Sequence, residues 1–241
     1  MGIIALPRGG YDLPDSIARH EPESSTVALW QFNKDLIDQG PNGLDMTEVG
    51  TLPYFEINPL EFASQPDNTN YGKVDPNDPQ LTITGELTIL TMIRNFELST
   101  DGVICSMNGA SGDGDDAENY LYSFRFNSSG QLEYFAESAG GTNQTFLATG
   151  GNMVVDTWHH VALVRQSSGD VEMFIDGMSV GSSSGLIPPV GGTNTVFWIG
   201  DEQAATGDLE GYLASLHILD RAMSGVEVLA EANRLLPSWQ V

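Results

Sequence analysis

The sequence predicts an all-β fold: a two-sheet antiparallel sandwich with an extended N-terminal arm and a short C-terminal helix. Three observations predict it. Apolar and polar residues alternate over short runs, turn residues separate these runs, and a helical period occurs only near the end of the chain. With 241 residues, the chain is long enough to bury a core without disulfides or metals. We therefore expect an arm over residues 1–25, a sandwich over 26–223, and a helix with its tail over 224–241.

The N-terminal arm contains several prolines and the pair Gly9 and Gly10, and it shows no amphipathic period. Such a composition favours an extended chain over a folded element. An arm of this kind is ordered when another surface holds it, and the simplest such surface is a neighbouring subunit. We assign this assembly role to four residues of the arm: Pro7, Arg8, Tyr11 and Pro14.

Period-two alternation identifies the strands. Residues 120–126 place four aromatic side chains on one face, and residues 158–165 and 212–219 alternate in the same way. This pattern is typical of half-buried strands packed in a sandwich. Turn residues separate the runs, and Asp176 followed by Gly177 predicts a two-residue hairpin turn.

The C-terminal end is the one segment with a helical pattern. Ser224 is placed to cap a helix with apolar positions such as Val228 and Leu235, and Pro237 stops it. No internal repeat of about 20 to 50 residues is visible, which counts against a propeller or a solenoid. One β-sandwich with a closing helix is therefore the predicted architecture.

The four tryptophans are candidates for stacking on sugar rings. Trp30, Trp158 and Trp198 lie on strands at positions that match a core, so we expect them to be buried. Trp239 lies near the C-terminus, and we expect it to be the least enclosed of the four.

Composition excludes several classes of partner. The chain has 33 Asp and Glu against 9 Lys and Arg, a formal charge of −24. This charge repels phosphate, so nucleic acids and anionic membranes are excluded as partners. No apolar run reaches the length of about 18 residues that a membrane span needs, and Cys105 has no second cysteine to pair with. Residues 1–10 lack the pattern of a signal peptide, so we expect synthesis in the cytosol without general secretion.

Several motifs, in order along the chain, resemble laminin-G-like domains. Residues 156–177 resemble the paired central strands of that family, and residues 27–43 resemble its opening strand and turn. Residues 81–89 and 198–227 resemble later strands and the closing helix. The resemblance implies a jelly roll of the concanavalin A-like lectin/glucanase superfamily over residues 26–223. In such domains two curved antiparallel sheets form a concave face, and this face and the rim loops often bind sugars.

The sequence argues against an enzyme. Glycoside hydrolysis needs two carboxylates that flank the scissile bond. Glycosidases of this superfamily carry them on one strand as Glu-x-Asp-x-x-Glu, and this chain has no such spacing. The neighbours His159 and His160 point to opposite faces of a strand, so they cannot share one metal ion. We therefore expect both histidines to be structural and the chain to be non-enzymatic.

Calcium is the one cofactor that the sequence supports. An acidic loop over residues 111–119 carries oxygen ligands among glycines, a combination that suits Ca²⁺. Its resemblance to the calcium-binding loops of pentraxins implies further ligands just after Gly200, although Ala204 replaces one of them. The candidate ligands are Asp113, Asp115, Asp116, Asn119, Glu202 and Gln203. A calcium site and a solvated acidic loop both remain open.

Three functions follow from these observations. The first is a structural or adhesion subunit of a larger particle, such as a capsid decoration or tail protein of a phage virion. A virion protein leaves the cell by lysis, which reconciles an extracellular type of domain with the missing signal peptide. The second is a free lectin-like carbohydrate-binding module, with or without calcium. A glycan-active enzyme ranks last. We expect neighbouring particle subunits and glycans as partners, and the virion surface as the location.

Overall fold

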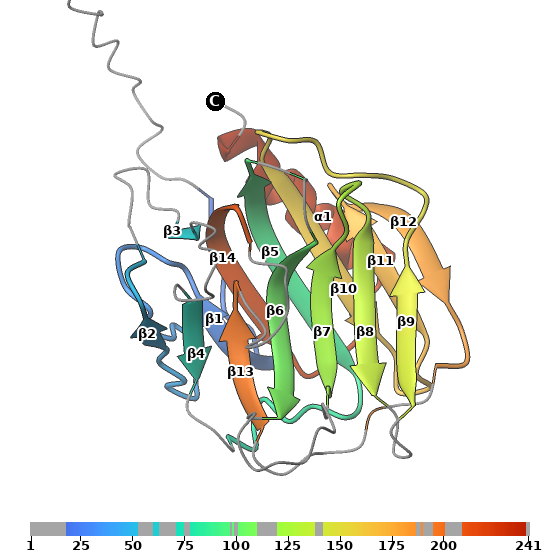
Figure 1. Cartoon of the computed structure of the whole chain (residues 1–241), viewed down its shortest axis with the longest axis horizontal. Helices are drawn as coiled ribbons and strands as arrows, with labels where there is room; N and C mark the ends of the chain where they lie inside the picture. Colours follow the sequence, from blue (N-terminus) through green and yellow to red (C-terminus); the bar gives the residue numbers. More distant parts are fainter. Residues whose placement is uncertain are drawn as a thin grey trace, which may run out of the picture.

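A computed structural model gives the architecture (Figure 1). It describes residues 18–52, 60–62, 71–74, 78–96, 98, 101–109, 120–137, 142–186, 189, 195–200 and 209–239. The four arm residues assigned to assembly, from Pro7 to Pro14, lie outside this set. Within it, no helix is long and apolar enough to cross a bilayer.

Two antiparallel sheets form a sandwich, as predicted (Figure 1). Sheet A has the order β1 (Thr26–Trp30), β14 (Gly211–Leu219), β5 (Leu87–Asn95), β10 (His159–Arg165), β11 (Val171–Ile175) and β12 (Met178–Ser183), and β3 (Leu60–Phe62) also pairs with β14. Sheet B has the order β2 (Thr47–Val49), β4 (Tyr71–Val74), β13 (Thr195–Ile199), β6 (Gly102–Gly109), β7 (Tyr122–Phe126), β8 (Leu132–Glu137) and β9 (Asn143–Leu147). The strands that alternation predicts are all present.

The main core lies between the two sheets. Trp30 of β1 is fully buried and stacks on Phe197 of β13, with 5.5 Å between the ring centroids. Arg165 is a charged side chain that is buried in this core, at 1% exposure. Its guanidinium donates to the backbone oxygens of Ile83 (2.6 Å) and Gly85 (3.0 Å). A buried charge is tolerated when its donors are satisfied in this way, so Arg165 fastens the chain before β5 to the core.

A buried carboxylate organises the first turn. Asp38 Oδ1 accepts hydrogen bonds from the backbone N–H groups of Leu29 (2.8 Å) and Gly40 (2.7 Å), and Oδ2 accepts one from Leu44 (2.9 Å). Asn42 donates to the carbonyl oxygen of Val27 (2.8 Å). Because these backbone donors satisfy the Asp38 carboxylate, the turn is held by the chain's own peptide groups.

The two local predictions at turns and caps are confirmed. Asp176 and Gly177 have φ of 53° and 77° and join β11 to β12. Two consecutive positive φ values are those of the tight hairpin turn whose twist matches the strands. Helix α1 (Gly225–Leu235) begins after Ser224, which forms a capping box with Glu227. The 3₁₀ helix η1 (Leu236–Ser238) contains Pro237 and ends the helical segment.

Helix α1 packs on the side of sheet A that faces away from sheet B (Figure 1). Val228 of the helix lies in one apolar cluster with Leu90 of β5, Ala162 of β10 and Phe174 of β11. As a result, all seven residues of β10 are buried. The prediction of a half-buried strand was wrong for β10, because alternation in a strand does not show that a helix will cover its second face.

Candidate functional site

The sandwich has two outer faces, one on each sheet. The outer face of sheet A lies under α1 and under residues 18–25, which we call the docking segment. On the outer face of sheet B, cross-strand register brings together a row of residues from successive strands: Lys73, Trp198, Ser106, Ser123, Phe135 and Thr145. Directly paired residues project to the same side of a sheet. Since Phe197 and Tyr134, next to this row, belong to the core, the row points away from it.

The middle of this row is enclosed. Trp198 is 3% exposed, and its ring meets the ring of Tyr71 edge-on with 5.1 Å between the centroids. Trp198 Nε1 and Ser106 Oγ are buried and have no hydrogen-bond partner among the described residues. Buried polar atoms of native proteins normally have partners. This pair of neighbouring atoms therefore marks a polar spot at the centre of the outer face of sheet B.

The end of the row on β7 and β8 is more open and carries an aromatic–ionic group. The Arg125 guanidinium lies over the ring of Phe135, with Cζ 4.7 Å from the ring centroid. Arg125 Nε also donates to Glu133 Oε1 at 2.5 Å, and both side chains are about one-fifth exposed, at 22% and 18%. Tyr120 meets the other edge of Phe135 at 4.9 Å. We call Arg125, Glu133 and Phe135 the β7–β8 site.

The β7–β8 site combines the groups that recognise a polyhydroxylated ligand. A guanidinium supplies several donors in a fixed plane, and a carboxylate supplies acceptors. Their ion pair keeps both charged groups in place at the outer face of sheet B. The ring of Phe135 beside them is only 9% exposed and lies under the guanidinium, so it holds the Arg125 side chain in place by a cation–π contact. The site can therefore bind a neutral polar ligand through non-covalent contacts.

Sequence reasoning treated Glu133 as isolated on its strand and did not select Arg125 or Phe135. A signal for the pair was present. The turn over residues 127–130 separates two alternating runs, and a short hairpin there places Arg125 opposite Glu133, as the register shows. The contact between Arg125 and Phe135 could not be read from the sequence, because it depends on the direction of two side chains.

The described residues hold no acid–base pair of the glycosidase type on β8. Glu133 and Glu137 share one side of this strand and are four residues apart, a separation of about 13 Å. Glycosidases need their two carboxyl groups about 5 to 9.5 Å apart. His159 donates through Nδ1 to Asp176 Oδ2 (2.8 Å), and its Nε2 accepts from the N–H of Val154 (2.9 Å). Both ring nitrogens of His159 are thus engaged within the chain.

The predicted calcium ligands lie outside the described residues, so their geometry remains a prediction. These are Asp113, Asp115, Asp116, Asn119, Glu202 and Gln203. In the part of the chain that is described, no group of three or more His, Cys, Asp or Glu side chains is arranged to hold a metal ion. Cys105 is buried, and burial raises the pKa of its thiol well above the usual range, so it is not a reactive nucleophile.

Three of the four expectations about tryptophan are confirmed. Trp30, Trp158 and Trp198 are buried. The expectation for Trp239 was wrong, because this side chain is only 6% exposed. Its ring lies 4.8 Å from that of Trp158, and its Nε1 donates to the carbonyl oxygen of Ala18 (3.1 Å). The C-terminal tail thus turns back onto sheet A and holds the start of the docking segment.

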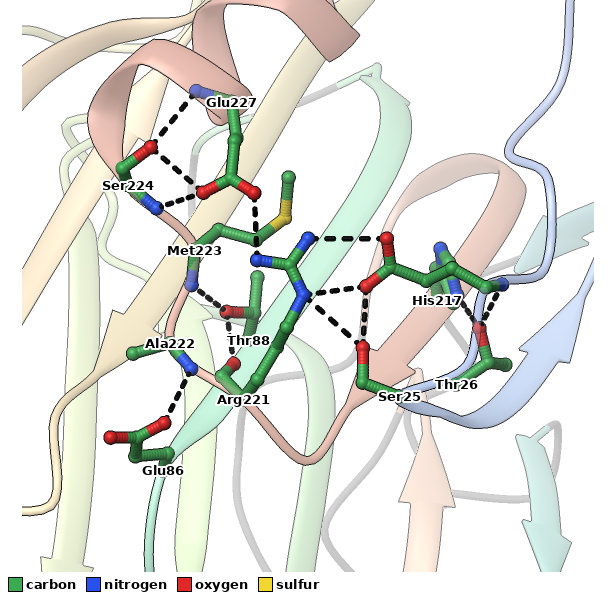
Figure 2. A network of polar contacts seen from close by, with 11 residues as sticks. Ser25, Thr26, Glu86, Thr88, His217, Arg221, Ala222, Met223, Ser224 and Glu227 are labelled. Atoms are coloured by element: carbon green, nitrogen blue, oxygen red, sulfur yellow. Dashed lines mark hydrogen bonds and ion pairs between the residues drawn. The ribbon is translucent and has the colours of Figure 1, made fainter.

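The docking segment is also fastened by an ionic network (Figure 2). Arg221, just after β14, donates through Nε to Glu23 Oε1 (2.6 Å) and through Nη1 to Glu227 Oε1 (2.9 Å). The hydrogen bond from Arg221 is the leading cause that lowers the pKa of Glu23. One arginine thereby links the docking segment to the capped end of α1.

Comparisons with known proteins identify the fold. A family model described as the concanavalin A-like lectin/glucanases superfamily matches residues 67–229. A search of curated proteins found no match.

Solved structures of binding domains resemble the chain. The binding domain of botulinum neurotoxin DC in complex with SialylT aligns with a TM-score of 0.66 and 14% identity, over 88% of this chain and 52% of that one. A botulinum neurotoxin type C structure, whose title describes cell entry dependent on two ganglioside molecules, gives 0.65 and 14%, over 88% and 51%. The chain thus spans about half the length of the neurotoxin chains.

A third structure matches over nearly its whole length. Domain 4 of AbnA, an extracellular arabinanase of glycoside hydrolase family 43 from Geobacillus stearothermophilus, was solved in complex with arabinotriose. It aligns with a TM-score of 0.63 and 17% identity, over 86% of this chain and 98% of that one. At such identities the likeness shows a shared fold.

Proposed function

We propose a binding function from one premise: the chain belongs to the concanavalin A-like lectin/glucanases superfamily. The proposed function is that of a non-enzymatic, lectin-like module that binds a glycan on the outer face of sheet B. Fold alone does not select a function, so the proposal depends on a specific group of side chains. That group is the β7–β8 site.

The observation that carries the proposal is the stacking of Arg125 on Phe135 together with the ion pair of Arg125 and Glu133. An exposed ion pair contributes little to stability, and its partly exposed side chains can still make hydrogen bonds to a ligand.

The similar structures lend support of a second kind. Their titles name a complex with SialylT, an interaction with gangliosides and a complex with arabinotriose. A ganglioside interaction and an arabinotriose complex are therefore named for proteins of this fold that share 14% and 17% identity with this chain. They do not select one sugar for this chain, so the ligand class proposed here is an oligosaccharide.

A glycan array followed by calorimetry tests the proposal. Arg125→Ala and Phe135→Ala should each weaken binding of the selected glycan by about tenfold or more, equivalent to about 1.4 kcal/mol. The matched control is Arg94→Ala, because Arg94 forms a similar partly exposed ion pair with Asp156 on another part of the surface. Equal binding by Arg125→Ala and by wild type, with the fold intact, would remove the β7–β8 site from the function.

Calcium is a separate proposal for the same module. It rests on the oxygen-rich loop around Asp116, as the sequence shows. Ca²⁺ should raise the melting temperature of the wild-type protein, because a ligand that binds only the folded state stabilises it. Asp116→Ala should abolish this rise. A melting temperature that is the same with Ca²⁺ and with a chelator would refute the calcium site.

A second candidate function is that of a subunit in a larger particle, such as a phage virion. The observation that favours it is the firm attachment of the docking segment: Ala18 accepts from Trp239, and Glu23 pairs with Arg221. Residues 1–17, with Pro7, Arg8, Tyr11 and Pro14, would then start from a fixed point and reach a neighbour. The assembly test should delete residues 1–17 and keep the docking segment. Light scattering after gel filtration should show an oligomer that becomes monomeric on deletion, and equal masses would refute this role.

A further inference from the structure

Three histidines meet under the docking segment. His20 comes from this segment, His160 from β10 and His217 from β14, and we call them the histidine cluster. The ring of His20 lies 5.6 Å from the ring of His160 and 5.6 Å from that of His217, measured between centroids. His20 and His160 are fully buried and His217 is 3% exposed. The cluster is thus a solvent-excluded group of titratable side chains that the proposed glycan site does not use.

Most ring nitrogens of the cluster are unsatisfied. His20 Nε2, both nitrogens of His160 and His217 Nδ1 have no hydrogen-bond partner among the described residues. The remaining two are bonded: His20 Nδ1 to Glu231 Oε1 of α1 (2.8 Å), and His217 Nε2 to Thr26 Oγ1 (2.8 Å). Each unsatisfied buried polar atom costs about 1–3 kcal/mol. The closed arrangement is therefore maintained by the packing around the cluster and not by its own hydrogen bonds.

The cluster lies where three elements meet. The hydrogen bond between His20 and Glu231 joins the docking segment to α1. The backbone N–H of Ala18 donates to Ser238 Oγ (3.2 Å) and joins it to the C-terminal tail. On sheet A, His160 pairs across the sheet with Met92 of β5, and His217 pairs with Leu90. The residues of β5 that pair with His160 and His217 are thus both apolar. Separation of the docking segment and α1 from the sheet would bring all three imidazoles into water.

Few charged groups face the cluster, and all but the exposed Glu21 are already paired in the part of the chain that is described. Helix α1 contributes Glu231 and Arg234, which bond to each other (3.0 Å and 2.5 Å). The docking segment contributes Glu23, and the chain after β14 contributes Arg221, which also form an ion pair. A hollow of about 300 Å³, lined by residues that include Glu21, His217 and Glu231, connects the edge of the cluster with solvent. Protons can therefore reach the cluster. Glu231 and Glu23 are already paired, so neither is an unpaired carboxylate that could neutralise a protonated histidine.

We propose that the histidine cluster is an acid-opened latch: its protonation releases the docking segment and α1 from the outer face of sheet A while the sandwich itself stays folded. Two or three imidazolium groups at this spacing would repel one another in a site that excludes water. Release hydrates them and separates the charges. It also uncovers the apolar side chains of sheet A that α1 covers, among them Phe174 and Trp158.

The direction of the pH effect follows from burial. Burial lowers the pKa of His160 to about 3 and that of His217 to about 3, and each is lowered further by the neighbouring His20. Burial is also the main cause that lowers the pKa of His20. The closed form therefore holds neutral imidazoles. Its stability is complete above the ordinary histidine pKa of about 6.5 and falls as the pH decreases from there toward 3.

Hydrogen exchange on the full-length protein tests the latch. Between pH 7 and pH 5, protection factors corrected for intrinsic exchange should fall in the docking segment and in α1 by about 30-fold for each histidine that gains a proton on opening. Amides of β6, β7 and β8 should keep their protection, because the sandwich stays closed. Unchanged protection of α1 at pH 5 would overturn the proposal, and so would an equal loss of protection in every strand.

Histidine variants separate the latch from a general acid effect. His160→Phe removes both unsatisfied nitrogens at similar volume, and His217→Gln keeps an amide near the Thr26 hydroxyl. Each variant should lower the acid-induced loss of protection by about 30-fold, and the double variant should retain only the contribution of His20. The matched control is His159→Gln, which removes the adjacent histidine outside the cluster and should leave the acid response as in wild type. An unchanged acid response in His160→Phe, a single substitution that retains the apolar packing, would refute the latch.

Discussion

The two outer faces of the sandwich differ in what covers them. On sheet A, α1 and the docking segment bury apolar side chains such as Phe174, which is 2% exposed. On sheet B, the end formed by β7 and β8 keeps a partly exposed ion pair, Arg125 with Glu133. One face is therefore part of the folded core, whereas the other retains charged groups at its surface.

With the proposed glycan site on sheet B, this difference would divide stability and binding between the two sheets of one sandwich. Covering a sheet with a helix stabilises the domain through apolar burial. A sheet that must accept a ligand cannot be covered in this way, because its groups have to remain accessible. The cover of sheet A also encloses the histidine cluster, so the more stable face carries the pH-sensitive group.

The largest expected effect compares two phenylalanines, one on each outer face. Phe174→Ala should destabilise the fold by about 3–5 kcal/mol, because it leaves a cavity between β11 and α1. Phe135→Ala should cost less, about 1–3 kcal/mol, because Phe135, although only 9% exposed, packs on Arg125 and Tyr120 and belongs to none of the apolar clusters of the described residues. Urea denaturation measures both. Equal costs would mean that the two faces contribute alike to the core.

The second effect depends on pH. In the unfolded chain His160 and His217 regain a pKa of about 6.5, whereas burial holds both at about 3 in the folded protein. Lowering the pH from 7 to 5 should therefore decrease the free energy of unfolding by about 2 kcal/mol for each of them.

Glu231 should not offset this loss at pH 5. Burial raises its pKa, but hydrogen bonds from His20 and Arg234 outweigh burial and keep the pKa well below the usual range. Its stabilising contribution is present above the ordinary glutamate pKa and is lost only at lower pH. Urea titrations at pH 7, 6 and 5 measure the trend. Constant stability across this range would show that the histidines are not buried as neutral groups.

The third effect compares two glycines with the same backbone conformation. Gly177 and Gly185 both have φ of +77°. A Cβ at Gly177 would lie 2.9 Å from Leu229 Cα of α1, whereas nothing lies within 4 Å of a Cβ at Gly185. Both alanine variants share the conformational cost of about 1–2 kcal/mol, and crowding should add about 1–3 kcal/mol for Gly177→Ala only. Similar melting temperatures for the two variants would place α1 farther from the β11–β12 turn.

These particular residues also show what the sequence could and could not predict. The Asp176–Gly177 turn and the Ser224 cap are local, so neighbouring residues determine them and the sequence was sufficient. The strands β7, β10 and β14 were predicted because alternation is also a local property. The cover on β10 was not predicted, since it requires α1 to return over sheet A from more than 50 residues away in the chain.

The candidate sites also differ in whether their residues are close in sequence or distant. Arg125 and Glu133 lie eight residues apart on one hairpin, within reach of sequence reasoning. His20 and His217 are 197 positions apart. The sheet order places β14 and β10 on either side of β5, and the docking segment brings His20 against both. Trp239 was misjudged for a similar reason, because its partners Trp158 and Ala18 are distant in sequence. Such contacts carry no local signal.

The smallest expected effect on stability belongs to the β7–β8 site. Arg125→Ala removes a partly exposed ion pair, and such pairs contribute about 0–1 kcal/mol. The guanidinium also covers Phe135, so the loss should approach the upper end of this range. Urea denaturation of Arg125→Ala, Glu133→Ala and the double variant isolates the pairwise energy. A cost above about 3 kcal/mol would be typical of a buried charge pair and would make the site a structural element. A small loss of unfolding free energy would mean that the fold does not depend on the pair. This is expected of residues whose role is to contact a ligand.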